Sequence, residues 1–387
     1  MPATVAYDPL DAATIADPLP VYAELRRHGP LHWHEGMNSW VFPRHEDCHR
    51  ILKDADTYAR DVRRVGEDVP RFRQTIQSVD PPGHKRVRTT FVRAFKDQDL
   101  GRIADRLRVA IQAVRRRTEP GVEFDYVEQV ARPLAIEASS AILGIPTPDG
   151  RLVGELSAAI ARRMDSGLDP SRRPDGDAAR HQLNELVDSF LARGSREGML
   201  SGFADPAGLD HYVTNTIAVI FNASYSTVFA SLGTTVDVLL DQPPDAVRDA
   251  LARDPDRAAD ELVRFAGPTQ GTSRRVTRDT LVHGTLLPRG ATVLALVGSA
   301  NHDEQAFDRP EQLNYDRWPN RHLGFGWGPH SCFGAPLGKL ALAVAHTELL
   351  HRAQPLTRAG ATRWKSSATL RTAEQIPVAF TPTRRGR

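Results

Sequence analysis

The sequence predicts a mainly α-helical protein with a minor β region, and three observations support this fold class. Apolar residues recur at helical spacing through most of the chain before Pro268. After Pro268 the pattern changes to short strands, with turn signals at His283–Gly284 and Pro288–Gly290. No internal repeat or low-complexity tract divides the chain. We therefore expect residues 1–387 to form one domain.

The first half of the chain predicts a small N-terminal sheet followed by helices. A helix led by a proline is expected over Pro18–His28, and strands at Leu31–His34 and Ser39–Pro43. The next segments are a helix over His45–Asp54 and an arginine-rich irregular loop over Asp61–Val79. Helical patterns then cover His84–Phe95, Leu100–Arg116, Val127–Leu143, Gly150–Met164 and Ala178–Arg193.

The second half is organised around one long apolar segment, Leu209–Leu240. Polar residues interrupt this segment, so it predicts a helix buried through a globular protein and not a membrane span, which needs about 20 consecutive apolar residues. Before it, Arg163–Asp177 is dense in Pro, Gly, Ser and Asp and predicts a mobile connector. After it, a buried strand is expected at Ala291–Val297 and a hairpin at Ser367–Phe380.

Composition limits the possible partners and the compartment. The 50 Lys and Arg residues nearly balance the 48 Asp and Glu residues, so no global field favours nucleic acid or a membrane surface as partner. Two cysteines, Cys48 and Cys332, form no disulfide framework, and Met1–Asp8 shows no leader pattern, so we expect a cytoplasmic protein. The group His45, Cys48 and His49 is too small for a metal site and favours ordinary helix packing.

The most informative segment is the glycine-punctuated loop Phe325–Gly334, which leads into a helical pattern ending near Ala353. Free backbone N–H groups and the positive end of the helix dipole stabilise a thiolate at a helix start, so a lowered pKa is expected for Cys332. Gly328 and Gly334 lack a Cβ, so the loop backbone can approach a large flat partner closely. The alternative is a lone buried cysteine in a glycine-rich turn.

The loop spacing Phe-x-x-Gly-x-His-x-Cys-x-Gly resembles the haem-thiolate loop of the cytochrome P450 superfamily, soluble bacterial type. The resemblance implies the P450 fold, in which a long central helix and the thiolate loop sandwich haem b (iron protoporphyrin IX). It implies Cys332 as the iron ligand and Phe325 and Gly326 as haem-binding residues. It also places a substrate-access lid at Arg163–Asp177.

A second segment, Asp80–Arg88, resembles the family's turn into a helix that reaches the haem propionates. Two buried carboxylates need charge-assisted donors, and the i, i+4 spacing puts His84 and Arg88 on one helix face. A basic, solvated helix is the alternative. The resemblance implies propionate binding by both residues.

The remaining propionate ligands are implied by two further positions. The family pattern has an arginine ten residues before a glycine that opens a strand turn, and counting back from Gly284 selects Arg274. Arg275 would take this role if the register shifts by one, since strand alternation lets only one of the two face the haem. His330, two residues before the cysteine, completes the set.

Glu261 and Arg264 share a helix face at i, i+3, which by itself indicates no more than a surface ion pair. In the family, however, a Glu-x-x-Arg helix joins a later arginine in a buried network behind the haem loop. Arg317 matches that later position. The resemblance therefore implies a structural role for all three residues, in support of the loop.

The oxygen-activating helix is where the chain departs from the family pattern of small residue, Gly, any, acid, Thr, Thr. Here the segment Ala223–Val228 retains Thr227, which implies a catalytic hydroxyl that donates a hydrogen bond to dioxygen. Ser226 replaces the acid and Ser224 the glycine, so proton delivery needs Ser226, Thr227, water or the substrate. The alternative is that these hydroxyls only satisfy backbone groups of the helix.

The resemblance implies a monooxygenase that takes electrons from a ferredoxin and ferredoxin reductase-type donor and oxidises a small organic or natural-product molecule or short peptide. Oxidative phenol or indole coupling without oxygen insertion is the second interpretation, because Ser226 replaces the acid. A haem sensor or carrier is the third. Lys85, Arg86 and Lys339 are candidates for a basic docking patch. Substrate-pocket positions are implied at Tyr225, Asn222, Thr269, Leu370 and Thr372.

Overall fold

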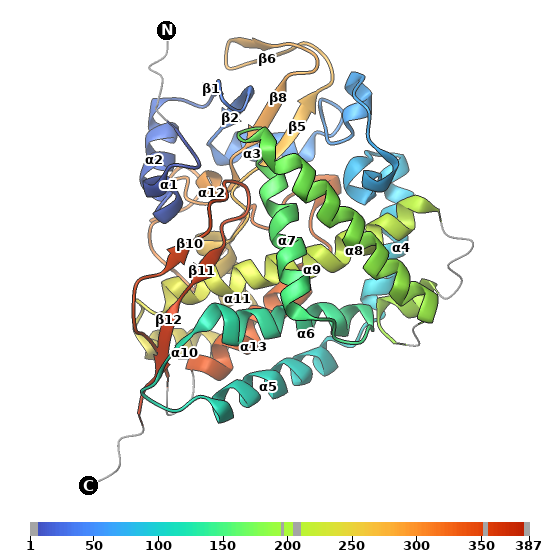
Figure 1. The fold of residues 1–387 in the computed structure, drawn as a ribbon. Helices are drawn as coiled ribbons and strands as arrows, with labels where there is room; N and C mark the ends of the chain where they lie inside the picture. Colours follow the sequence, from blue (N-terminus) through green and yellow to red (C-terminus); the bar gives the residue numbers. More distant parts are fainter. Residues whose placement is uncertain (1–6, 195–196, 204–209, 351–354, 383–387) are drawn as a thin grey trace.

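The computed structural model describes residues 7–194, 197–203, 210–350 and 355–382, and Figure 1 shows a mainly helical fold with small sheets along one side. The predicted fold class is confirmed. The α-helices are α1 Ala12–Ala16, α2 Leu19–His28, α3 His45–Lys53, α4 Gly83–Lys96, α5 Leu100–Arg117, α6 Arg132–Leu143, α7 Gly150–Met164, α8 Arg173–Arg193, α9 His211–Leu239, α10 Pro244–Arg253, α11 Pro255–Ala266, α12 Val297–Ala300 and α13 Ala335–Leu350.

The strands form small sheets whose partners are far apart in the sequence. The strands are β1 His32–His34, β2 Ser39–Phe42, β3 Tyr58–Ala59, β4 Glu123–Asp125, β5 Thr272–Val276, β6 Thr280–Val282, β7 Thr285–Leu287, β8 Thr292–Ala295, β9 Leu356–Arg358, β10 Arg363–Trp364, β11 Ala373–Gln375 and β12 Pro377–Phe380. The largest sheet has the order β1-β2-β8-β5-β3, with β2 and β8 parallel. This sheet joins the predicted N-terminal strands to the predicted strand near Ala291.

The long helix α9 is the centre of the helical part of the molecule. It contacts α6, α8, α11 and α13, and Figure 1 shows α7 and α8 lying over it. Its length and hydropathy would suit a membrane span, but 67% of its most apolar window is buried inside the protein. The prediction of a buried core helix is therefore confirmed.

Two predictions in the connecting segments are wrong. The expected connector at Arg163–Asp177 is mostly helical, because α7 continues to Met164, a 3₁₀ turn (η5) covers Pro170–Arg172 and α8 begins at Arg173. Proline in the first turn of a helix needs no hydrogen-bond donor, so Pro174 starts α8 where it was expected to keep the chain irregular. The segment is also fastened, because the buried carboxylate of Asp165 accepts the backbone N–H groups of Ala368 and Thr369.

The predicted hairpin at Ser367–Phe380 is the second error. Strand β11 pairs with β10, whereas β12 pairs with β4 and β9, so the two strands of the expected hairpin belong to different sheets. Only Ile376 lies between them, and its N–H donates to Asp125 Oδ1 at 3.1 Å. One residue is too short for a hairpin turn, which needs at least two, so each strand takes a distant partner.

The irregular loop at Asp61–Val79 is confirmed. Three 3₁₀ turns interrupt it: η1 at Val62–Val65, η2 at Arg71–Arg73 and η3 at Ile76–Ser78. Cys48 packs as predicted in a second hydrophobic core around the largest sheet, and its thiol donates to the carbonyl of Phe42 at 3.1 Å. The predicted end of the last helix near Ala353 lies outside the described residues.

Buried histidines between the central helices should make the fold sensitive to acid. His346 on α13 lies 2.8 Å from Thr235 Oγ1 on α9, and burial lowers its pKa from 6.5 to about 3. Below pH 6.5 the unfolded chain binds a proton there that the folded chain does not, so stability falls as pH falls. A His346→Gln variant is expected to remove about 2 kcal/mol of the stability change between pH 7 and 5, measured by urea unfolding.

The matched control for this test is His28→Gln, because His28 is exposed at the end of α2. This variant is expected to keep the pH dependence of the parent protein. An unchanged slope of stability against pH in His346→Gln would contradict the prediction.

Candidate functional site

The cysteine loop ends directly before α13, as the sequence predicts. A 3₁₀ turn at Gly328–His330 precedes Cys332, and the N–H of Cys332 donates to the carbonyl of Phe325 at 2.8 Å. Removal of the sulfur from water raises the pKa of the Cys332 thiol, although the residue keeps some exposed surface. The N–H groups of Gly334 and Ala335 and the Arg88 guanidinium oppose this effect. The direction is therefore opposite to the lowered pKa expected from the helix start, because the loss of water around the sulfur outweighs these N–H groups.

The glycine requirement in this loop is set by α3. Gly328 has a φ of +71°, and a Cβ there would lie 2.5 Å from the carbonyl oxygen of Leu52 and 3.0 Å from Lys53 Cα. At Gly334 a Cβ would make only an ordinary contact, 3.8 Å from Cys332 Sγ. The clearance that was predicted for both glycines is thus needed at Gly328, where the loop passes against the end of α3.

A Gly328→Ala variant is expected to lose more stability than a Gly284→Ala variant. Both glycines have positive φ, but a Cβ at Gly284 would meet no atom within 4 Å. Gly284→Ala should cost about 1–2 kcal/mol of backbone strain. Gly328→Ala should cost about 1–3 kcal/mol more, because the loop must move away from Leu52. Urea unfolding of both variants measures the difference, and equal losses would contradict the steric account.

The predicted propionate ligands His84 and Arg88 lie beside the cysteine loop. The rings of His84 and His330 have centroids 4.4 Å apart, and His84 Nε2 is buried without a hydrogen-bond partner. Burial lowers the pKa of His84 to about 4, and the charges of His330 and Arg88 add to this effect. Arg88 Nη1 donates to the carbonyl of Ser331 at 2.8 Å, which ties α4 to the loop.

The strand register decides between Arg274 and Arg275. Arg274 is buried, and its Nη1 donates to Thr272 Oγ1 and to the carbonyl of Ser273. Arg275 points away and pairs with Glu67 at 2.7 Å. Burial lowers the pKa of Arg274 to about 9, with the positive charge of Arg60 as a further cause. Arg274 is therefore the inward residue, as counting from Gly284 selects.

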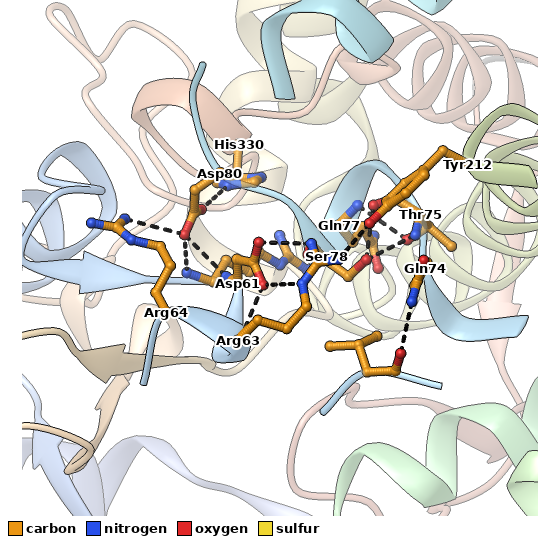
Figure 2. A network of polar contacts seen from close by, with 12 residues as sticks. Asp61, Arg63, Arg64, Gln74, Thr75, Gln77, Ser78, Asp80, Tyr212 and His330 are labelled. Atoms are coloured by element: carbon orange, nitrogen blue, oxygen red, sulfur yellow. Dashed lines mark hydrogen bonds and ion pairs between the residues drawn. The ribbon is translucent and has the colours of Figure 1, made fainter. Parts of the chain in front are cut away.

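Two residues of this cluster were missed by the sequence analysis, Asp80 and Arg60. Asp80 Oδ1 accepts a hydrogen bond from His330 Nε2 at 2.9 Å (Figure 2). Its Oδ2 accepts the backbone N–H groups of Arg60 and Asp61 at 3.0 Å. Asp80 stands in the quoted Asp80–Arg88 segment, so its position was visible. Its partners come from other parts of the chain, and no local sequence pattern predicts these contacts.

The numbers of basic and acidic side chains in this cluster show whether it could hold the edge of a cofactor that carries two carboxylates. Asp80 is the carboxylate nearest to most of the basic side chains of the cluster, Arg64 Nη1 lies 3.5 Å from its Oδ2, and the buried Nε2 of His84 has no acceptor. A buried ring nitrogen without a hydrogen-bond partner is costly, as are buried guanidinium groups with too few acceptors, so the cluster is complementary to added carboxylates. The basic residues are Arg60, His84, Arg88, Arg274 and His330. This donor set fits the two propionates of haem beside Cys332.

The arginine-rich loop, Asp61–Val79, is bound to α9 through Arg63. Arg63 donates to both carboxylate oxygens of Asp61 at 2.7 Å and to the hydroxyl of Tyr212 at 2.5 Å (Figure 2). Its Nη2 also donates to the carbonyl of Ser78. The part of the loop that carries Arg63 is therefore held in place, close in sequence and in space to the turn that carries Asp80.

The segment predicted to activate oxygen lies in the middle of α9. The hydroxyl of Thr227 donates to the carbonyl of Ala223 at 2.7 Å, and Thr227 is exposed within this mostly buried helix. Ser226 is buried, and Ser224 donates to the carbonyl of Phe221. Helix-satisfying bonds of this kind were the alternative interpretation, and they are present. The catalytic role of Thr227 and Ser226 stays a prediction.

Tyr225 and Asn222 pack against neighbouring helices. Tyr225 is 1% exposed, and its hydroxyl lies 3.2 Å from Arg132 Nη1 of α6. Asn222 Oδ1 accepts a hydrogen bond from Ser157 of α7 at 2.6 Å. These contacts indicate a structural role between α6, α7 and α9, in place of the predicted position in a pocket wall.

The other predicted pocket residues lie together. Thr269 and Leu370 form an antiparallel bridge, and Arg371 N–H donates to the carbonyl of Pro268 at 2.8 Å. The hydroxyl of Thr372 donates to the carbonyl of Leu370. Residues about 100 positions apart are thus brought side by side, and their contact with a substrate stays a prediction.

Glu261, Arg264 and Arg317 form the expected buried network. Arg264 donates to both oxygens of Glu261 at 2.9 and 2.8 Å, and Arg317 Nε lies 3.1 Å from Glu261 Oε2. Arg264 Nη1 also donates to the carbonyls of Asn301 and Pro310. One helix is thereby joined to the segment that precedes the cysteine loop.

Comparisons with known proteins agree with the fold and with a haem site at this position. Residues 256–370 match the family model "Cytochrome P450". Nocardicin C N-oxygenase of Nocardia uniformis is 29% identical over 93% of this chain and 95% of its own. Erythromycin C-12 hydroxylase of Saccharopolyspora erythraea is 29% identical over 86% of each chain. The crystal structure of CalO2 has a TM-score of 0.84 and 28% identity, covering 98% of this chain and 100% of its own.

The chain has the fold of bacterial cytochrome P450 proteins and is similar to the three named proteins over 86–98% of its length, which makes it an oxidoreductase. Similarity to the cytochrome P450 family implies haem as the cofactor.

Proposed function

We propose that this chain is a monooxygenase that uses haem b and dioxygen, with electrons from a separate ferredoxin and ferredoxin reductase-type donor, to oxidise a small natural-product molecule in the cytoplasm. The observation that supports it best is the basic cluster beside Cys332, in which one carboxylate lies among several buried arginine and histidine side chains. When bound, the haem would supply the site at which dioxygen is reduced and activated.

The residues of the chain would divide the work of holding the cofactor. Cys332 would supply the thiolate ligand, whose electron donation favours cleavage of the O–O bond. His84, Arg88, Arg274 and His330 would hold the propionates. Phe325 and Gly326, at the start of the loop, would lie against the haem. Cofactor charge would then complete the hydrogen bonding that His84 Nε2 lacks.

Proton delivery would depend on hydroxyl groups of α9. Thr227 can donate a hydrogen bond toward the oxygen when it rotates away from the carbonyl of Ala223. Ser226 stands where the family pattern has an acid, so it can relay a proton only through water or Thr227. Label from ¹⁸O₂ in the product, measured by mass spectrometry, would support monooxygenation. An oxidised product without label would support oxidative coupling.

The electron donor would dock on α4. An open groove of about 650 Å³ is lined by the basic residues Lys85, Arg86 and Arg93, together with Gly202 and Phe203. Lys339 is less suitable than the sequence suggested, because it pairs with Asp256 at 2.7 Å and Asp260 at 3.2 Å. Acidic surfaces, such as those expected on a ferredoxin-type partner, complement the groove and would make electron transfer sensitive to salt.

The decisive test of the proposed function is spectroscopic. The haem-loaded protein is reduced and exposed to carbon monoxide, and a red-shifted absorption band of a thiolate-ligated haem is expected. Electron consumption that depends on an added substrate would exclude a haem sensor or carrier. Folded, haem-loaded protein without the band would overturn the proposal.

A further inference from the structure

Arginines from three separate segments gather around Asp177, at one end of the helices that lie over α9 in Figure 1. Arg163, in the last turn of α7, donates from Nε to Asp177 Oδ1 at 2.5 Å and from Nη2 to Oδ2 at 3.4 Å. Arg180 follows Asp177 by three residues on α8 and so lies on the same helix face. Arg73 approaches from η2. Three cations around one carboxylate leave an excess of positive charge.

Of the three arginines, Arg180 has the most strongly lowered pKa. Burial lowers the pKa of Arg180 to about 10, and the like charges of Arg73 and Arg163 add to this effect. Its Nη1 is shielded from solvent and has no hydrogen-bond partner. Because a buried guanidinium N–H without an acceptor is costly, this position favours a ligand that brings an acceptor oxygen. The pKa of Arg73 is also lowered, by the protein around its guanidinium and by the charge of Arg163, although part of the side chain is exposed.

The helix contacts show that this arrangement is built and specific. Gly176 lies in the first turn of α8, where a Cβ would stand 2.3 Å from Arg163 Cβ, so the stem of Arg163 can cross α8 only at a glycine. Phe72 stacks on His181 of α8 with ring centroids 4.1 Å apart, and Asn184 donates to the carbonyl of Phe72 at 3.5 Å. These contacts hold η2, and with it Arg73, against α8.

The cluster is remote from the predicted oxygen-activating residue. The loop that carries Arg73 is bound to α9 by Asn215, whose Nδ2 donates to the carbonyl of Arg71 at 2.8 Å. Thr227 lies twelve residues further along α9, which corresponds to about 18 Å of helix. A molecule that contacts both places must therefore be long.

We propose that Arg73, Arg163 and Arg180 bind a carboxylate of the substrate, at the end of the molecule remote from the carbon that is oxidised. The inference rests on the proposed function and names a substrate class for it. A guanidinium presents parallel N–H donors that match a carboxylate, and Arg180 Nη1 supplies the free donor. Asp177 keeps Arg163 in place, so a monoanion neutralises part of the remaining charge.

A test of anion binding that does not use activity is the thermal unfolding of the haem-loaded protein with sulfate in place of chloride at constant ionic strength. The parent protein is expected to gain several degrees in Tm, with saturation at millimolar sulfate. Arg180→Gln should lose most of this gain. Arg108→Gln, an exposed arginine that pairs with Asp105 on α5, should keep it. Equal responses of the parent protein and Arg180→Gln would overturn the proposal.

A second variant, Arg73→Gln, tests the proposal in case Arg180→Gln does not fold. Arg73→Gln changes an exposed residue on η2, so its folding should not depend on the side chain. The sulfate concentration that gives half of the maximal gain in Tm is expected to be at least threefold higher in this variant. A response identical to that of the parent protein would count against the site.

The substrate class is tested with dodecanoate and its neutral counterpart dodecanamide, each titrated against the haem absorption. Dodecanoate is expected to bind the parent protein at least tenfold more tightly than the amide, and the ratio should approach one in Arg180→Gln. If the parent protein shows the carbon monoxide band but no preference for the carboxylate, the inference fails and the proposed function stands. A missing band would overturn the proposed function, while the sulfate test still reports on the cluster.

Discussion

A Glu261→Gln variant is expected to lose about 3–5 kcal/mol of stability, because it leaves two buried arginines without their counter-charge. Glu261 and Arg264 have fully buried side chains, and Arg317 is nearly so. Glutamine keeps the shape of the side chain but carries no charge and offers one oxygen in place of two. The backbone N–H of Asn314 and the amide of Asn320 also donate to Glu261, so the loss extends to the segment before the cysteine loop.

Urea unfolding and the yield of soluble, haem-loaded protein measure this effect. The matched control is Glu24→Gln, which removes an ion pair of 2.8 Å with Arg27 in which the two side chains are 42% and 64% exposed. Exposed ion pairs contribute about 1 kcal/mol or less, so the control should stay close to the parent protein. Similar losses in both variants would contradict the special role of the buried network.

Replacing Cys332 by serine is expected to abolish the red-shifted carbon monoxide band, while Cys48→Ser keeps it. Serine provides no thiolate, so any haem retained by the basic cluster would lack the sulfur ligand. Cys48 is buried between α3 and the largest sheet and donates to the carbonyl of Phe42, a bond that a serine hydroxyl can replace. The two variants therefore make the same chemical change at two positions, so a difference between their bands identifies the cysteine that binds the iron.

Two measurements make this comparison sharp. Haem content is determined by the absorption of the denatured pigment, and the band is then compared per haem. Circular dichroism in the far ultraviolet shows whether each variant is folded. A thiolate band in folded Cys332→Ser, or its loss in folded Cys48→Ser, would overturn the assignment of the ligand.

Local sequence signals predicted most helices well. The helix over Gly150–Met164 has the predicted bounds, because Asp149 caps its first turn by accepting the N–H groups of Arg151 and Leu152. The errors have physical reasons of two kinds. Pro174 can either break or begin a helix, and only its position at the start of α8 decides between the two. The strands near the C-terminus take partners that no local pattern reveals.

The candidate site shows the same division. The residues quoted from motifs meet as the resemblance implies, since Arg88 contacts Ser331 in the cysteine loop and His84 lies against His330. Asp80 was passed over because an acidic residue before two prolines looks like an ordinary turn. Tyr225 was assigned to a pocket from its place on α9, but its direction around the helix axis is set by Arg132 and Phe229.

The sequence by itself determined the class of protein, through fixed residue types at short spacings around Cys332 and Glu261. Such spacings are carried by single helices and loops, where neighbours in sequence are neighbours in space. Tertiary structure alone decided that Arg274 and not Arg275 faces inward, and that Asp80 balances the basic cluster. It also decided that Arg73 and Arg180 lie near the ion pair of Arg163 and Asp177. Charge balance depends on distances between segments far apart in the chain, and folding sets those distances.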